Sequence, residues 1–103
     1  MYSEAAIWKT IRDLKPNDNR VRIIGRVIEA GENHIVIDDG TGVILIDTSN
    51  IAKEKISANV LVTGSVHQRS DNKIVIEADL INNIDYVNFE IYHKIYDLIK
   101  KHR

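Results

Sequence analysis

The residue types that most often carry out catalysis or bind metals are few in this 103-residue chain and poorly spaced for either role. The chain has no cysteine, which removes thiolate nucleophiles, thiolate metal ligands and disulfides. Its four histidines do not occur at spacings that pair them as metal ligands. Asp38, Asp39 and Asp47 match no cation-binding loop, and an aspartate before Gly40 is what a tight turn itself favours. We therefore expect no catalytic residue, no metal site and no cofactor.

Basic side chains are the other candidate group, because lysine and arginine can contact phosphates. Arg20, Arg22 and Arg26 fall in one apolar stretch, and Arg69 and Lys73 flank a turn. If the three arginines project from one surface, they could meet a nucleic-acid backbone; the alternative is a solvated strand face paired with nearby acids. The formal net charge is −1. Dedicated nucleic-acid binders usually carry a basic excess, so this charge argues against strong autonomous DNA binding.

The elements that must position these side chains are predicted to be five short strands. Their expected ranges are 20–29, 34–38, 43–47, 59–68 and 73–79. An Asp39-Gly40 pair between two apolar runs predicts a hairpin, because glycine accepts the positive φ of such turns. Gly25 and Gly64 lie inside strands, and we expect Gly25 to shift the register as a bulge or bend. A long bent strand followed by a hairpin is typical of a small five-stranded barrel.

The last segment, residues 85–103, changes to helical periodicity, with Asp85 placed as its N-cap. Its apolar side chains occupy about 200° of a helical wheel. They are Val87, Phe89, Ile91, Tyr92, Ile95, Tyr96, Leu98 and Ile99. A helix that lies on one domain needs an apolar face of only a little over ~100°. We therefore predict that part of this face contacts another polypeptide.

Residues 1–19 form a lead-in that is expected to pack on the barrel. The spacing of Ile7, Ile11 and Leu14 is helical, but an irregular plug at one end of the barrel fits equally well. Trp8 suits an end-plug or an interface anchor, and the alternative is a surface on which a base stacks. The lead-in, the barrel (20–84) and the last segment (85–103) are expected to form one structural domain. No apolar run could span a bilayer and no signal peptide is apparent, so we expect no membrane partner.

Three stretches, which span four of the predicted strands, carry a connected pattern. Residues 20–27 read RVRIIGRV, residues 35–44 read IVIDDGTGVI, and residues 60–66 read VLVTGSV. This pattern resembles the OB-fold of replication protein A, above all its middle and small subunits and their relatives in telomere-capping complexes. The resemblance covers most of residues 20–79, and the Asp-Asp-Gly-Thr-Gly hairpin is its most specific part. It implies an OB-fold barrel followed by one helix that packs with the helices of partner OB-fold subunits.

One departure from that family concerns the DNA-contacting surface. No Phe, Tyr or Trp lies between Trp8 and Tyr86, so the barrel has no aromatic platform for bases. Stacking is worth about 1–3 kcal/mol per base, and its absence leaves mainly phosphate contacts. OB-folds place such contacts on the loop that here holds Arg69 and Lys73.

The resemblance implies a non-enzymatic small subunit of a single-stranded DNA-binding complex, in the cytoplasm and nucleoid or in a eukaryotic nucleus. Its role would chiefly be assembly through the last helix, with weak contacts to the DNA backbone. Two alternatives stay open. One is an autonomous single-stranded DNA- or RNA-binding protein, and the other is a protein-interaction adaptor that contacts no nucleic acid.

Overall fold

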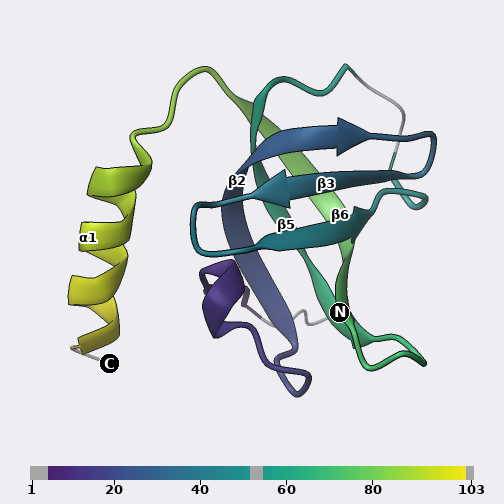
Figure 1. The fold of residues 1–103 in the computed structure, drawn as a ribbon, viewed down its shortest axis with the longest axis horizontal. Helices are drawn as coiled ribbons and strands as arrows, with labels where there is room; N and C mark the ends of the chain where they lie inside the picture. The colour runs from purple at the N-terminus through teal and green to yellow at the C-terminus, as the bar shows by residue number, and fades with distance from the viewer. Residues whose placement is uncertain (1–4, 52–54, 102–103) are drawn as a thin grey trace.

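Five strands close into a barrel and a sixth strand lies outside it (Figure 1). The computed structural model describes residues 5–51 and 55–101. The barrel strands are β2 (Arg20–Ala30), β3 (His34–Asp38), β4 (Val43–Asp47), β5 (Asn59–Gln68) and β6 (Ile74–Ile84). They pair in the order β2–β3–β4–β6–β5, and β5 pairs back onto β2. The lead-in contains β1 (Ile7–Trp8), which is parallel to β2, and the 3-10 helix η1 (Ile11–Asp13); helix α1 (Phe89–Lys101) follows β6. This confirms the predicted barrel with one C-terminal helix.

The core of the barrel follows directly from alternation along each strand. Each barrel strand buries two apolar side chains that lie two residues apart, because successive side chains point to opposite faces of a strand. The ten residues are Val21 and Ile23, Ile35 and Ile37, Ile44 and Ile46, Val60 and Val62, and Ile76 and Ala78. Ile11 and Leu14 of the lead-in pack against this cluster. Over the described residues the lead-in is one short strand and one 3-10 turn, so of the two alternatives left open it follows the irregular segment and not the helix; residues 1–4 lie outside the described residues.

The two mid-strand glycines have different structural reasons. The prediction of a register shift at Gly25 is wrong, because β2 pairs with β5 without interruption from Arg20 to Arg26. Gly25 is instead a close-packing position, where an added Cβ would lie 2.9 Å from Ile37 Cδ1. The irregularity of β2 comes later, between Val27 and Glu29. Gly64 does lie at a register shift, and a Cβ there would meet the Glu77 carbonyl oxygen at 2.3 Å.

The hairpin between β3 and β4 binds the lead-in through a buried carboxylate. Asp39 is 1 % exposed. Its Oδ1 accepts hydrogen bonds from the N–H and hydroxyl of Thr41 at 2.8 and 2.7 Å, and its Oδ2 accepts the N–H of Ile11 at 2.8 Å. The Thr41 hydroxyl oxygen also accepts the N–H of Arg12 at 3.1 Å. Gly40 has the predicted positive φ, 88°. The hairpin therefore caps η1, whose own N-cap residue makes no side-chain cap.

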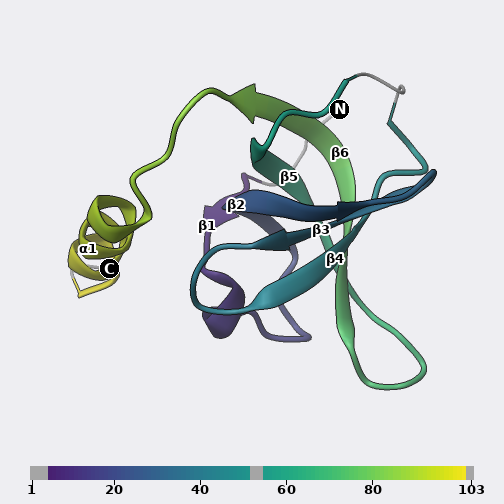
Figure 2. The ribbon, with the colours of Figure 1, turned by 45° about the horizontal axis from the view of Figure 1, so that its top comes forward.

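Helix α1 stands to one side of the barrel (Figures 1 and 2). It contacts the lead-in at Asp13, and its His93 lies beside Gly40 of the β3–β4 hairpin. The Tyr96 hydroxyl donates a hydrogen bond of 2.9 Å to Asp13 Oδ2, and Lys100 Nζ lies 2.8 Å from the same oxygen. Asn88 Oδ1 accepts the N–H of Ile91 at 3.2 Å, so Asn88 has the capping role that was predicted for Asp85. Residues 85–88 form a connector, and the helix begins at Phe89.

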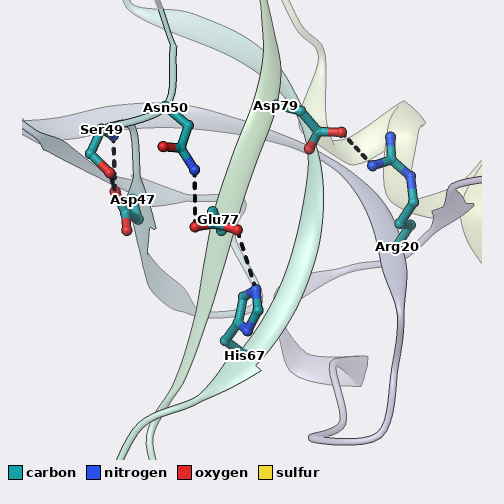
Figure 3. Close-up of polar contacts among 7 residues, drawn as sticks. All are labelled: Arg20, Asp47, Ser49, Asn50, His67, Glu77 and Asp79. Atoms are coloured by element: carbon teal, nitrogen blue, oxygen red, sulfur yellow. Dashed lines mark hydrogen bonds and ion pairs between the residues drawn. The ribbon is translucent and has the colours of Figure 1, made fainter.

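The seam between β4 and β6 is short and is reinforced by polar side chains (Figure 3). These parallel strands share two paired positions, Ile46 with Ile76 and Asp47 with Glu77. Beside them, Glu77 accepts a hydrogen bond from Asn50 Nδ2 at 3.1 Å and lies 3.5 Å from His67 Nε2. Hydrogen bonds from the Ser49 hydroxyl and N–H hold the pKa of Asp47 below its ordinary value. Residues of β4 before Ile46 lie outside this pairing.

Candidate nucleic-acid and partner interfaces

A groove of about 400 Å³ opens beside the first residues of β4 and β6. The lead-in contributes Ile11 and Leu14 to it, and the loop between β5 and β6 contributes Arg69 and Lys73. Its other lining residues are Val43, Ile44, Leu45, Asn72, Ile74 and Val75. The walls are mostly aliphatic and the cations come from one loop. Such a groove can accept an apolar group that carries a negative charge beside it.

The loop that carries the two cations is an ordered turn. Arg69 and Lys73 are joined by a backbone hydrogen bond of 2.8 Å, and Asn72 adopts a positive φ of 68°. Asp71 Oδ1 accepts the N–H of Lys73, and its other oxygen lies 3.6 Å from Arg69. This ion pair is exposed and is therefore worth little, about 0–1 kcal/mol. Arg69 can exchange Asp71 for a phosphate at small cost.

The three arginines of β2 lie elsewhere, at alternate positions on the outer face of the barrel. Arg20 pairs with Asp79 of β6 (Figure 3). Arg22 lies over Trp8, with its guanidinium carbon 5.7 Å from the ring centroid. Arg26 is exposed, and no ion pair to it occurs within residues 5–51 and 55–101. The five predicted phosphate-binding cations therefore form two separate groups, of which Arg69 and Lys73 alone line a groove.

Helix α1 has a covered apolar side and an exposed apolar side. Tyr96 is 4 % exposed and faces the lead-in. Burial raises the pKa of Tyr92 to about 12, with the Asp39 charge as the second cause. The exposed side consists of Ile91, Ile95, Leu98 and Ile99, which we call the α1 stripe; their exposed fractions are 53, 51, 58 and 50 %. Of the remaining predicted interface residues, Val87 and Phe89 are half-buried. The helix therefore keeps one apolar side without cover from the described residues.

A second pocket lies between the lead-in and α1 and was not predicted. Lys9, Asp13, Lys15, Tyr96 and Lys100 line this space of about 280 Å³. A hydrogen bond from Lys100 is the main cause that lowers the pKa of Asp13, and the same bond raises the pKa of Lys100. Both groups are therefore charged at neutral pH. The sequence offered no signal for this pocket, because its two halves are more than 80 residues apart.

Asp38 and His34 make structural contacts. Asp38 accepts the N–H of Gly40 at 2.7 Å, as expected for a turn aspartate. His34 lies 2.9 Å from Glu29. Within the part of the chain that the structure describes, no three His, Asp or Glu residues come together to hold a metal ion. The described helices include none that is long and apolar enough to cross a membrane.

Comparison with known families gives this geometry its context. A sequence model of the family described as Replication factor A protein 3 matches residues 14–103. The chain belongs to the replication factor A protein 3 family. This confirms the resemblance drawn from the strand pattern. A search of curated protein sequences found no match.

Solved structures similar to this family member include proteins of replication and telomere complexes. The S. pombe Stn1–Ten1 complex contains a chain that aligns with a TM-score of 0.73 at 20 % identity, covering 97 % of this chain and 96 % of that one. The S. pombe telomere capping protein Ten1 aligns with a TM-score of 0.71 at 19 % identity, covering 94 and 99 %. U. maydis replication protein A bound to single-stranded DNA aligns with a TM-score of 0.65 at 22 % identity, covering 77 and 73 %. At these identities the likeness supports the fold.

Proposed function

We propose that this chain is the small OB-fold subunit of a replication protein A-like complex that binds single-stranded DNA. Its main role is assembly, through the α1 stripe, and its groove adds weak contacts to the DNA backbone. The observation that carries the proposal is the stripe itself, because four large aliphatic side chains on one helix face are about half exposed. Contiguous apolar surface of this kind marks interaction sites in soluble proteins. The family membership and the fold of the Stn1–Ten1 and replication protein A chains favour a partner OB-fold subunit.

The size of the stripe sets what it can contribute. Burying the exposed half of one Ile or Leu side chain is worth about 1 kcal/mol, so the four give on the order of 4 kcal/mol. Association costs roughly 4–15 kcal/mol in lost translational and rotational freedom. The stripe is therefore the centre of a larger interface. Tyr86, in the connector before α1 and 75 % exposed, is a suitable neighbour for that interface.

Co-purification from the native cell tests the assembly role. The tagged wild-type chain should bring a second polypeptide, whereas Ile95→Asp should come alone with an unchanged circular dichroism spectrum. Burying one aspartate in an apolar interface costs at least about 3 kcal/mol, which is a roughly hundredfold loss of affinity. Lys94→Asp, on the adjacent polar side of the helix, is the matched control and should keep the partner. A partner that stays bound to Ile95→Asp would overturn the proposal.

The groove supports an alternative function, an autonomous single-stranded DNA- or RNA-binding protein. This alternative predicts that the isolated chain binds oligonucleotides tightly and that binding weakens steeply with salt. The adaptor alternative predicts that no nucleic acid touches the chain in any complex. Arg69→Glu with Lys73→Glu, tested within the purified complex, separates the adaptor from our proposal. Weaker DNA binding by this variant supports the proposal, and unchanged DNA binding supports the adaptor.

A further inference from the structure

The pocket between the lead-in and α1 has the composition of an anion site. Three of its five lining residues are lysines and one is an aspartate, so the lining carries a formal charge of +2 (three positive, one negative). We propose that this pocket binds a phosphodiester of single-stranded nucleic acid, as a continuation of the groove. This inference rests on the proposed function, because it extends the path of the same ligand.

The three lysines of the pocket differ in whether a carboxylate already pairs with them. Lys9 lies 3.5 Å from Asp18, and Lys100 lies 2.8 Å from Asp13. No carboxylate pairs with Lys15 Nζ anywhere in residues 5–51 and 55–101. Lys15 therefore makes the first contact, and the other two lysines can share their charge with the ligand. The carboxylates of Asp18 and Asp13 hold the Lys9 and Lys100 side chains in place in the absence of a ligand.

The position of the pocket links it to the groove. Residues 9–15 separate the two spaces, since Ile11 and Leu14 line the groove whereas Asp13 and Lys15 line the pocket. In both ribbon views the lead-in lies on the side of the barrel that faces α1, and the β5–β6 loop lies on the far side (Figures 1 and 2). A single-stranded nucleic acid whose phosphate backbone passes Arg69 and Lys73 can cross the lead-in and reach Lys15. Two basic sites on either side of one short segment suit a polymer with repeated phosphates better than a ligand with a single phosphate.

The pocket also connects nucleic-acid binding with the position of α1. Tyr96 and Lys100 belong to α1, whereas Lys9 and Lys15 belong to the lead-in. The pocket therefore exists while the helix is docked through Asp13. A bound phosphate would contact both elements and stabilise this docked position, in which the α1 stripe faces away from the barrel. Nucleic acid should accordingly reduce fraying of α1.

Nuclear magnetic resonance of the full chain, titrated with an oligothymidylate of about 20 nucleotides at low salt, locates the contact. This probe exceeds the ~4–16 nucleotides that one OB-fold covers. The inference predicts amide shift changes at the pocket residues Lys9, Asp13 and Lys15 and at residues 96–100, in addition to the groove residues. Changes confined to the groove residues Ile11, Leu14, 43–45 and 69–75 would overturn the inference and leave the groove contact intact.

A charge-removal series gives the second readout. Each phosphate contact contributes about 0.7 to the slope of log affinity against log salt for single strands. Lys15→Gln should lower that slope by about 0.7, which is a roughly 2.6-fold change over a fourfold range of salt. Lys55→Gln removes the same charge from an exposed residue outside both spaces and should leave the slope unchanged. Equal slopes for the two variants would refute the inference. The co-purification experiment, with nuclease added to the lysate, removes nucleic acid and therefore judges the proposed assembly separately.

Discussion

Replacing Asp39 with asparagine should destabilise the protein far more than the same replacement at its neighbour Asp38. Both aspartates precede the hairpin glycine, and sequence alone treats them as similar turn residues. In the structure, the Asp39 carboxylate is buried and accepts three hydrogen bonds, two from Thr41 and one from Ile11. Asp38 accepts one, from Gly40. The two positions therefore form a matched pair of identical substitutions in different surroundings.

The expected magnitude follows from the hydrogen-bond count. Asparagine at position 39 offers one oxygen and one NH₂ group, so the NH₂ group faces either the Ile11 N–H or the Thr41 N–H, and that backbone donor loses its acceptor. One unsatisfied buried donor costs about 1–3 kcal/mol, and the loss of charge-assisted bonding adds to it. We expect a loss of about 3 kcal/mol for Asp39→Asn. At Asp38 the asparagine oxygen can still accept the Gly40 N–H, so the loss should stay below about 0.5 kcal/mol.

Differential scanning calorimetry measures this difference directly. For a domain of this size, about 1 kcal/mol corresponds to a shift of ~4–8 °C in the unfolding temperature. Asp39→Asn should therefore lower that temperature by about 12–24 °C, and Asp38→Asn by at most about 4 °C. Thr41→Val removes the hydroxyl but keeps the shape of the side chain, and its decrease in unfolding temperature should lie between those of the two aspartate variants. Similar unfolding temperatures for Asp38→Asn and Asp39→Asn would refute the view that Asp39 ties the lead-in to the barrel.

Three further outcomes concern the attachment of α1. Tyr96→Phe should cost about 1 kcal/mol by removing the hydrogen bond to Asp13, whereas Tyr86→Phe, at an exposed site, should cost nothing measurable by urea denaturation. The Lys100 hydrogen bond lowers the pKa of Asp13 in the folded protein below the ordinary 3.8. Asp13 therefore stabilises the folded state above pH 3.8, and this stabilisation is lost as the pH falls through the folded-state pKa. Asp13→Asn should therefore weaken the dependence of the free energy of unfolding on pH in this acidic range. An unchanged pH dependence would contradict the role given to Asp13. Tyr92, with a pKa of about 12 against an ordinary 10.0, favours folding until pH rises through its folded pKa; an absorbance titration that shows all tyrosines ionising near pH 10 in the folded protein would contradict its burial.

The barrel was predictable because its signals are local. Alternation along the first strand places Val21 and Ile23 on one side, and both are buried in the core. The Asp-Gly pair specified the hairpin and the positive φ of Gly40. Both signals depend on residues within a few positions of one another.

The errors concern features that depend on distant neighbours. A glycine inside a strand can mark a bulge or a close contact, and only the approach of Ile37 from the next strand distinguishes these cases at Gly25. The start of α1 was placed at Asp85, but β6 continues to Ile84 and the connector takes residues 85–88. Asp85 and Asn88 are both good N-cap residues, so local preference could not choose between them.

The candidate sites were predictable in part. The loop cations Arg69 and Lys73 followed from the resemblance to OB-folds, which place oligonucleotide contacts on the loop between the last two strands. Their neighbours in the groove, Ile11 and Leu14, could not be predicted, because the path of the lead-in depends on the Asp39 contact. Lys9, Lys15 and Lys100 meet only because α1 folds back onto residue 13. A helical wheel indicated the surplus apolar face of α1 but not which part the barrel covers.

Hydroxyl-radical footprinting of the native complex tests the central claim most directly, because it reports the solvent exposure of individual side chains. Leu80 and Ile28 on the barrel are 52 and 51 % exposed and serve as internal references for the stripe residues Ile95 and Leu98. Our account predicts that Ile95 and Leu98 oxidise as fast as the references in the isolated chain and several-fold more slowly in the complex. Equal oxidation of the stripe in the isolated chain and in an intact complex would contradict the account.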